Sequence, residues 1–181
     1  MQLTGSMKQF ILHWGEMGTR WGVNRTVAQV HALLYLSPQS LTAEDIADTL
    51  SVARSNVSTS LKELQNWNLV QVDSRIGDRR DFFETSADVW TLFLTVVEQR
   101  VEREIIPTLT MLRRCAIEAQ AERPSQPTVT ARITAMQAFL EELYGWYAQI
   151  RKLPPASMRS LINIGSGITR ILPKARRRRL D

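Results

Sequence analysis

The stretch that decides the fold is residues 40–84, which read SLTAEDIADTLSVARSNVSTSLKELQNWNLVQVDSRIGDRRDFFE. Its first half predicts two helices, over 43–50 and 54–66, because apolar residues recur there at intervals of three and four. The break between them at Ser51-Val52 is short, which is typical of a helix-turn-helix. We expect the second helix to turn three apolar side chains toward the core: Val57, Leu61 and Leu64.

The opposite face of the helix over 54–66 carries short polar side chains together with cations. Such a face suits the major groove of DNA, which admits a helix but little bulk on the side that leads. Taken alone, it could equally be a solvated surface. With the helix and turn that precede it, we expect six of its residues to contact DNA: Arg54, Ser55, Asn56, Ser58, Thr59 and Lys62.

Beyond these helices the pattern changes to two short apolar runs, which predict strands at 69–72 and 82–84. The charged loop between them contains Gly77-Asp78 and predicts a hairpin. We expect Asp78 to hold an arginine in position through a charge-assisted bond, although a solvated turn aspartate fits the sequence as well. The loop carries three arginines that could follow phosphates or enter the minor groove: Arg75, Arg79 and Arg80.

A helix-turn-helix followed by such a ribbon resembles the winged helix-turn-helix of the MarR superfamily. The resemblance continues upstream into HWGEMGTRWGVNRTVAQVHALLYLS at 13–37, which is similar to the GbsR-type branch. It implies a dimeric transcriptional regulator that binds double-stranded DNA, most simply a repressor, and some members respond to small ligands. By position, it places the six polar and cationic residues on the recognition helix and GDRR at 77–80 on the wing.

Two positions depart from the pattern of the family. Ala53 stands where a capping serine is usual, and a missing N-cap costs about 1 kcal/mol of helix stability. Ser51 stands where a glycine is common. Neither change removes an expected DNA contact.

The flanking segments are also helical in pattern. Aromatic side chains at helical spacing predict an N-terminal helix, which its glycines weaken, and Asn24 can cap the next helix over 25–36. A long apolar stripe follows from Trp90 to Ala119, in which Pro107 should kink or split the helix. Two further helices are expected over 128–152 and 156–172, after a break at 123–127.

The expected fold class is therefore mainly α: a winged helix-turn-helix domain with a small two-stranded wing, plus long dimerisation helices. We expect four segments: an N-terminal helix (1–24), the DNA-binding domain (25–85), a helical dimerisation and effector region (86–173) and a basic tail (174–181). The tail is either a phosphate-binding arm or a solvated run of charge.

One DNA-binding domain reads one half-site, whereas tight and specific binding usually takes two. We therefore expect a homodimer built from the N-terminal helix and the helices after residue 86, although the long stripe could instead be intramolecular core. Nine residues are expected at the interface: Phe10, Trp14, Trp21, Trp90, Leu94, Val97, Val101, Ile105 and Leu112.

Composition limits the other classes of function. The net charge of the 181 residues is +5, but the tail holds five Lys/Arg against one Asp, so overall basicity is no argument for DNA binding. The sequence offers no nucleophile–base pair, Cys/His cluster, cofactor motif, signal peptide or membrane span, so we expect a cytoplasmic protein that is not an enzyme. The alternative is a winged-helix module that binds another protein and not DNA.

The sequence gives the least information about a small-molecule effector. Five aromatic residues could line a pocket for a cationic ligand, although aromatic residues at helical spacing are more often core: Trp14, Trp21, Tyr144, Trp146 and Tyr147. His13, His31 and Cys115 are expected to be structural.

Overall fold

The computed structural model describes residues 1–121, 127–154, 157 and 160, and the chain divides into two compact units, Met1–Gln99 and Arg100–Asp181. Three expected features lie wholly or almost wholly outside the described residues: the break after Glu122, the helix over 156–172 and the basic tail.

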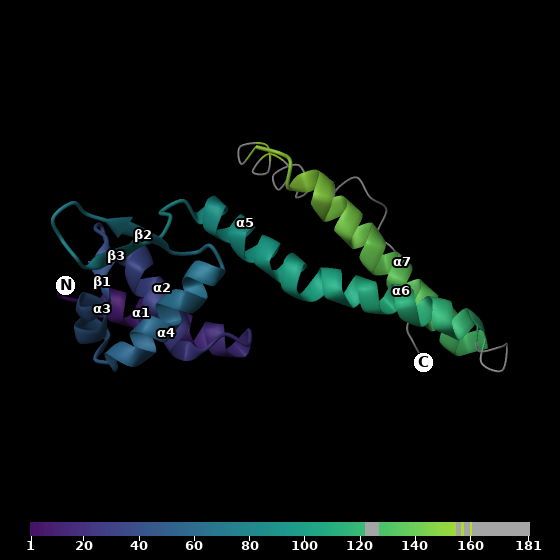
Figure 1. Cartoon of the computed structure of the whole chain (residues 1–181), viewed down its shortest axis with the longest axis horizontal. Coiled ribbons are helices and arrows are strands. Elements are labelled where there is room, and N and C mark those ends of the chain that lie inside the picture. Colours follow the sequence, from purple (N-terminus) through teal and green to yellow (C-terminus); the bar gives the residue numbers. More distant parts are fainter. Residues whose placement is uncertain (122–126, 155–156, 158–159, 161–181) are drawn as a thin grey trace. The chain divides into compact units, whose positions relative to one another are not determined.

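The first unit consists of helices and a small antiparallel sheet (Figure 1). In chain order its elements are α1 (Gly5–Arg20), α2 (Arg25–Leu36), β1 (Leu41–Thr42), α3 (Ala43–Leu50), α4 (Arg54–Asn66), β2 (Gln71–Ser74), β3 (Asp81–Glu84) and α5 (Val89–Arg100). The helix-turn-helix is α3 and α4, and the wing is the β2–β3 hairpin. The mainly helical winged fold expected from the sequence is confirmed.

The sheet contains one strand that the sequence did not predict. The strand order is β1-β3-β2, so that Phe83 of β3 lies opposite Leu41 on one side and Val72 on the other. β1 has only two residues, which is too short for an alternating pattern to show. Pairing with β1 makes β3 the central strand and fixes the base of the wing against the start of α3.

The core of the first unit forms where α2, α3 and α4 meet the sheet. Its most deeply buried side chains are Val30, Leu33, Ile46, Val57, Leu61 and Leu64. The inward face expected for the recognition helix is therefore confirmed, with Val57, Leu61 and Leu64 each at most 2 % exposed. Burying each such side chain contributes about 1.5–3 kcal/mol, which holds α4 in place and leaves its other face to solvent.

α1 packs on α2 through its glycines and through Phe10, which stacks on Tyr35 of α2 with ring centroids 6.2 Å apart. Ile11 and Gly15 are the buried residues of α1, and a Cβ at Gly18 would lie 2.5 Å from the Cβ of Ala28. The glycines that weaken α1 as an isolated helix are thus the surface that lets the two helices approach closely. The face that carries Trp14 and Trp21 stays largely exposed.

Two capping devices set the helix-turn-helix. Thr42 and Asp45 form a capping box at the start of α3, in which each side chain accepts a hydrogen bond from the other residue's backbone N–H. Hydrogen bonds from Thr42 hold the pKa of Asp45 below its usual value. Ser51 ends α3 in the left-handed conformation, and Ala53 begins α4 without a side-chain cap, as expected.

The second unit contains the π-helix η1 (Val101–Ile105), α6 (Ile106–Ala121) and α7 (Pro127–Ile150). The π turn lies directly before Pro107, so the chain accommodates the proline, which lacks an amide, by widening the helix. α6 and α7 lie side by side, joined by an ion pair between Arg113 and Glu141 at 2.8 Å (Figure 1). No helix within the described ranges has the length and apolar character to cross a membrane.

Candidate nucleic-acid interface

The outward face of α4 presents the polar residues expected there. Arg54, Ser55, Asn56, Thr59 and Lys62 are exposed. The sixth residue, Ser58, is half-buried, because it lies at the edge of the face where α4 meets the wing. The six residues therefore cover the side of α4 that faces away from Val57, Leu61 and Leu64, and Arg54, Ser58 and Lys62 lie at its edge toward the wing.

Hydrogen bonds within α4 determine which donor and acceptor groups of this face are available to a partner. The Thr59 hydroxyl donates to the Ser55 carbonyl oxygen at 3.1 Å, so Thr59 offers a methyl group and an acceptor oxygen to a partner. In the described part of the chain, the Asn56 amide makes no hydrogen bond, so its donors and its acceptor are available together. An amide of this kind can bind adenine in a bidentate manner.

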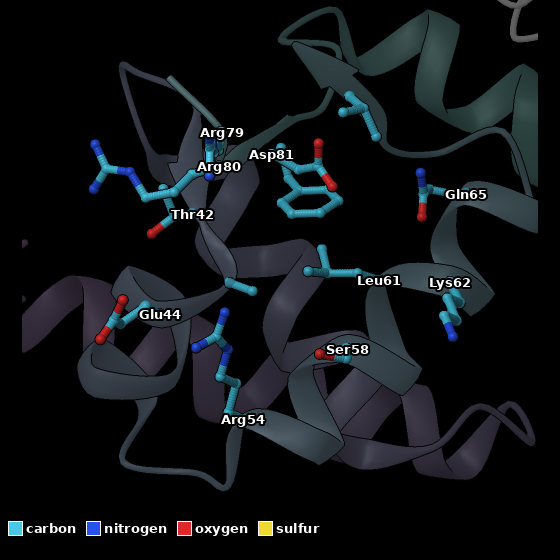
Figure 2. Close-up of a pocket in the computed structure, with 13 residues that line it drawn as sticks. Thr42, Glu44, Arg54, Ser58, Leu61, Lys62, Gln65, Arg79, Arg80 and Asp81 are labelled. Carbon is cyan, nitrogen blue, oxygen red and sulfur yellow. The ribbon is translucent and has the colours of Figure 1, made fainter. Parts of the chain in front are cut away.

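A cavity of about 390 Å³ separates the recognition helix from the wing (Figure 2). It is lined by residues from the start of α3, from one edge of α4 and from the sheet. Four cations surround it: Arg54 and Lys62 on the α4 side, and Arg79 and Arg80 on the wing side. Two carboxylates, Glu44 and Asp81, also lie at its edge. Cations on two walls of one groove suit a phosphate backbone that runs between them.

Arg80 is held at the wing by Asp78. The Nε and Nη2 atoms of Arg80 donate to the two carboxylate oxygens of Asp78 at 3.0 and 2.6 Å, and the Arg80 backbone N–H also donates to Oδ1 at 3.0 Å. The hydrogen bonds from the side chain and backbone of Arg80 lower the pKa of Asp78 to about 2. Asp78 thus makes the charge-assisted contact with an arginine that the sequence led us to expect.

Arg79 and Arg75 differ sharply in their surroundings. Arg79 is exposed, lines the cavity and makes no ion pair with any described residue. Arg75 lies outside that lining and contacts Ser40, Asp73 and the Phe82 ring. The three wing arginines, which the sequence treats as equivalent, therefore occupy three different environments.

Several residues at this site were missed by sequence reasoning. Gln65 lines the cavity on the same edge of α4 as Ser58 and Lys62, so extending their helical spacing by one step would have found it. Glu44 and Asp81 are brought to the cavity only by the packing of α3 and the sheet on α4, which no local pattern shows.

The nine residues expected at a dimer interface are spread over both units. Phe10 stacks on Trp14 with ring centroids 5.4 Å apart, and Trp90 meets Phe93 edge to face. Trp21 is 61 % exposed. The other members of the set are half-buried: Leu94, Val97, Val101, Ile105 and Leu112.

The remaining candidate residues are a histidine, a cysteine and five aromatic residues. His31 is buried in the core, and its burial lowers its pKa to about 4. Cys115 is half-buried on α6, and no group of three His, Cys, Asp or Glu side chains that could hold a metal occurs within the described ranges. Of the five aromatic residues considered for a ligand pocket, Trp14 and Trp21 belong to the first unit and the other three to the second.

Comparison with known proteins places these features in context. The model of the MarR family matches residues 21–81, which contain α2, the helix-turn-helix and β2 of the wing and end at the first residue of β3. A curated relative, the HTH-type transcriptional repressor GbsR of Bacillus subtilis (strain 168), is 26 % identical over 102 residues. That alignment covers 56 % of this chain and 54 % of the relative, so the chain matches about half the length of that protein.

A solved structure described as a transcriptional regulator has a similar fold. Its TM-score is 0.56 with 17 % sequence identity, and the match covers 80 % of this chain and 99 % of the other. At this identity the likeness supports the winged helical fold and carries no information about ligands.

Proposed function

Because the model of the MarR family matches residues 21–81, we propose that the chain is a winged helix-turn-helix transcriptional regulator of this kind that binds specific sequences of double-stranded DNA as a homodimer. The GbsR relative is named as a repressor, and we infer the same sign of regulation here. In this proposal residues 25–85 bind DNA, 1–24 and 86–173 form the dimer and any effector site, and 174–181 is a basic tail. The protein acts in the cytoplasm and is not an enzyme.

One observation carries the proposal: Arg54, Ser58 and Lys62 of α4 border the same groove as Arg79 and Arg80 of the wing. The α4 face enters the major groove, where Asn56 and Thr59 contact base edges. Arg54 and Lys62 on one wall, with Arg79 and Arg80 on the other, hold the phosphates or reach into the minor groove.

Binding to duplexes selected from a random-sequence library tests this proposal. Each lost phosphate contact lowers the slope of log K against log salt by about 0.9, so a dimer that lacks Arg79 in both subunits should lose about 1.8 from its slope. Arg79→Ala should weaken binding to every sequence. Asn56→Ala should instead change which bases are selected while the slope stays unchanged.

Arg132→Ala is the matched control, because Arg132 is an exposed cation on α7 in the other unit. This variant removes the same charge and should leave both the slope and the selected sequence as in the wild type. Wild-type protein that shows no salt-dependent retention of DNA would refute DNA binding and favour the protein-binding alternative.

A further inference from the structure

The Phe82 ring organises the base of the wing. Phe82 lies on the central strand β3, opposite Thr42 of β1 on one side and Asp73 of β2 on the other. The residue is 8 % exposed, and its backbone is held between two neighbouring strands. The guanidinium carbon of Arg75 lies 3.9 Å from the centre of the ring, and that of Arg80 lies 5.5 Å from it. The ring therefore supports two of the three wing arginines.

Arg75 is also bonded at the edge of its guanidinium group. Its Nη2 donates to the Ser40 hydroxyl at 2.8 Å, and its Nε donates to a carboxylate oxygen of Asp73 at 3.4 Å. Ser40 in turn donates to the same oxygen of Asp73 at 3.5 Å. Ser40 immediately precedes β1, so this set of contacts, which we call the Arg75 anchor (Ser40, Asp73, Arg75 and Phe82), joins the wing to the strand that leads into α3.

This geometry separates the roles of the three arginines. Arg75 has one face on an aromatic ring and two of its nitrogens bonded, and it does not line the groove between α4 and the wing. Arg79 and Arg80 do line it. Arg80 also has two nitrogens bonded, to Asp78, so the lining of the groove, and not bonding alone, separates Arg80 from Arg75. Arg79 makes no ion pair with a described residue.

We propose that Arg75 is a positioning residue, held by Ser40, Asp73 and Phe82, that fixes the wing beside the recognition helix, and that Arg79 and Arg80 supply the DNA contacts of the wing. The inference rests on the proposed DNA binding and replaces the expectation that all three arginines contact DNA. A wing without the anchor must be ordered at the moment of binding. Affinity then falls, while the phosphate contacts in the complex remain the same.

Two variants with an unchanged net charge can distinguish a positioning role of Arg75 from a direct DNA contact. Ser40→Ala removes the hydroxyl that receives Arg75, and Arg75→Lys keeps the cation but loses the planar group that stacks and bonds at once. For both, we expect affinity for a fluorescent duplex, chosen by the wild-type protein from a random library, to fall roughly 3- to 10-fold with an unchanged salt slope. Ser74→Ala, the same change at an exposed serine of β2, is the control and should match the wild type.

The opposite pattern would overturn the inference. If Arg75 contacts phosphate, Arg75→Lys should bind nearly as well as the wild type, Ser40→Ala should have no effect, and Arg75→Ala should flatten the slope as Arg79→Ala does. Failure of the wild-type protein to bind any duplex would reject the proposed function itself, which distinguishes the two failures.

Amide hydrogen exchange of the free protein tests the Arg75 anchor independently of DNA binding. In the free protein, Ser40→Ala and Arg75→Lys should speed amide hydrogen exchange at residues 75–81, because the wing loses its tie to the chain before β1. Arg79→Ala should leave exchange in this segment at the wild-type rate. Equal exchange in Ser40→Ala and the wild type would show that Ser40 does not anchor the wing and would overturn the inference.

Discussion

Ser51 is the residue on which the turn of the helix-turn-helix depends. Its φ of 53° and ψ of 45° are left-handed, a conformation that costs an L residue roughly 1–2 kcal/mol and glycine almost nothing. Glycine loses more entropy on folding, by about 0.5–1 kcal/mol, so the two effects partly cancel. We predict that Ser51→Gly raises the free energy of unfolding in urea by roughly 0.5–1 kcal/mol.

Ser51→Val should have the opposite effect on stability to Ser51→Gly, since a β-branched side chain is least tolerated at positive φ. It should lower the free energy of unfolding by more than Ser51→Gly raises it. A stabilising Ser51→Val would contradict the left-handed turn.

Ala53 leaves the first turn of the recognition helix uncapped. A serine there could accept a hydrogen bond from a backbone N–H of that turn, as Thr42 does in α3. We predict that Ala53→Ser stabilises the protein by about 1 kcal/mol in urea unfolding, whereas Ala53→Thr should give somewhat less. No gain from either variant would mean that the first turn of α4 is satisfied in some other way.

His31 makes the stability of the core depend on pH. The folded protein holds its pKa at about 4 through burial, against 6.5 in the unfolded chain, so between these values the unfolded state binds more protons. The stability contributed by the neutral imidazole is therefore complete above pH 6.5 and is lost as pH falls toward 4. At pH 5 the loss should be on the order of 2 kcal/mol, measured by urea unfolding against pH.

His31→Gln should abolish this dependence between pH 7 and 5, whatever its effect on absolute stability. The lowered pKa values of Asp45, Asp78 and Glu141 act below this window, so they do not obscure it. A variant that keeps the full pH dependence would show that another group is responsible.

At the scale of elements, the close packing of α1 on α2 leaves no room for a larger side chain at Gly18. A Cβ at Gly18 would lie 2.5 Å from the Cβ of Ala28, and neither atom can move without the helices moving apart. We predict that Gly18→Ala lowers the free energy of unfolding by about 1–3 kcal/mol, despite the better helix propensity of alanine. Gly5→Ala on the same helix meets no atom within 4 Å and should be nearly neutral.

Sequence patterns predict an element well where burial alone decides its faces. The inward and outward faces of α4 follow from helical spacing, and the cap at Thr42 follows from a local rule. The glycines of α1 show the limit of this reasoning. Local propensity counts Gly15 and Gly18 as weaknesses, and only the approach of α2 makes them a contact surface.

The candidate site divides in the same way. The residues of α4 that we expect to face DNA share one short segment, so one periodicity places them all. Arg75 depends on Ser40, 35 positions earlier, and on a ring in a different strand. The strand that brings Ser40 there has two residues, and nothing in so short a run predicts its pairing. The distinction between an anchored and a free arginine is therefore tertiary information.

At the scale of the whole molecule, α7 carries an exposed apolar surface of the kind that the proposed homodimer would need. None of its 24 residues is buried, and four large apolar side chains recur at intervals of three, four and three. These four, which we call the α7 stripe, are 53, 59, 42 and 62 % exposed in chain order: Met136, Phe139, Leu143 and Trp146. Such spacing is that of a seam between helices, and exposed apolar area of this kind marks an interaction surface. The α7 stripe supports the proposed homodimer better than the half-buried residues of α5.

We predict that Phe139→Glu with Leu143→Glu gives a folded monomer in sedimentation at micromolar concentration. Burying two carboxylates against apolar partners is strongly unfavourable, so association should fail while the winged domain stays intact. Linked half-sites exceed single ones by about 10²–10⁴-fold, so affinity for a two-half-site duplex should fall at least about 100-fold. Thr134→Glu, which adds a charge at an exposed position of α7 outside the stripe, should remain dimeric and bind as the wild type does. If the double variant still sediments as a dimer, the α7 stripe is not the dimer interface. The next candidate is then the exposed apolar surface with Trp14 and Trp21.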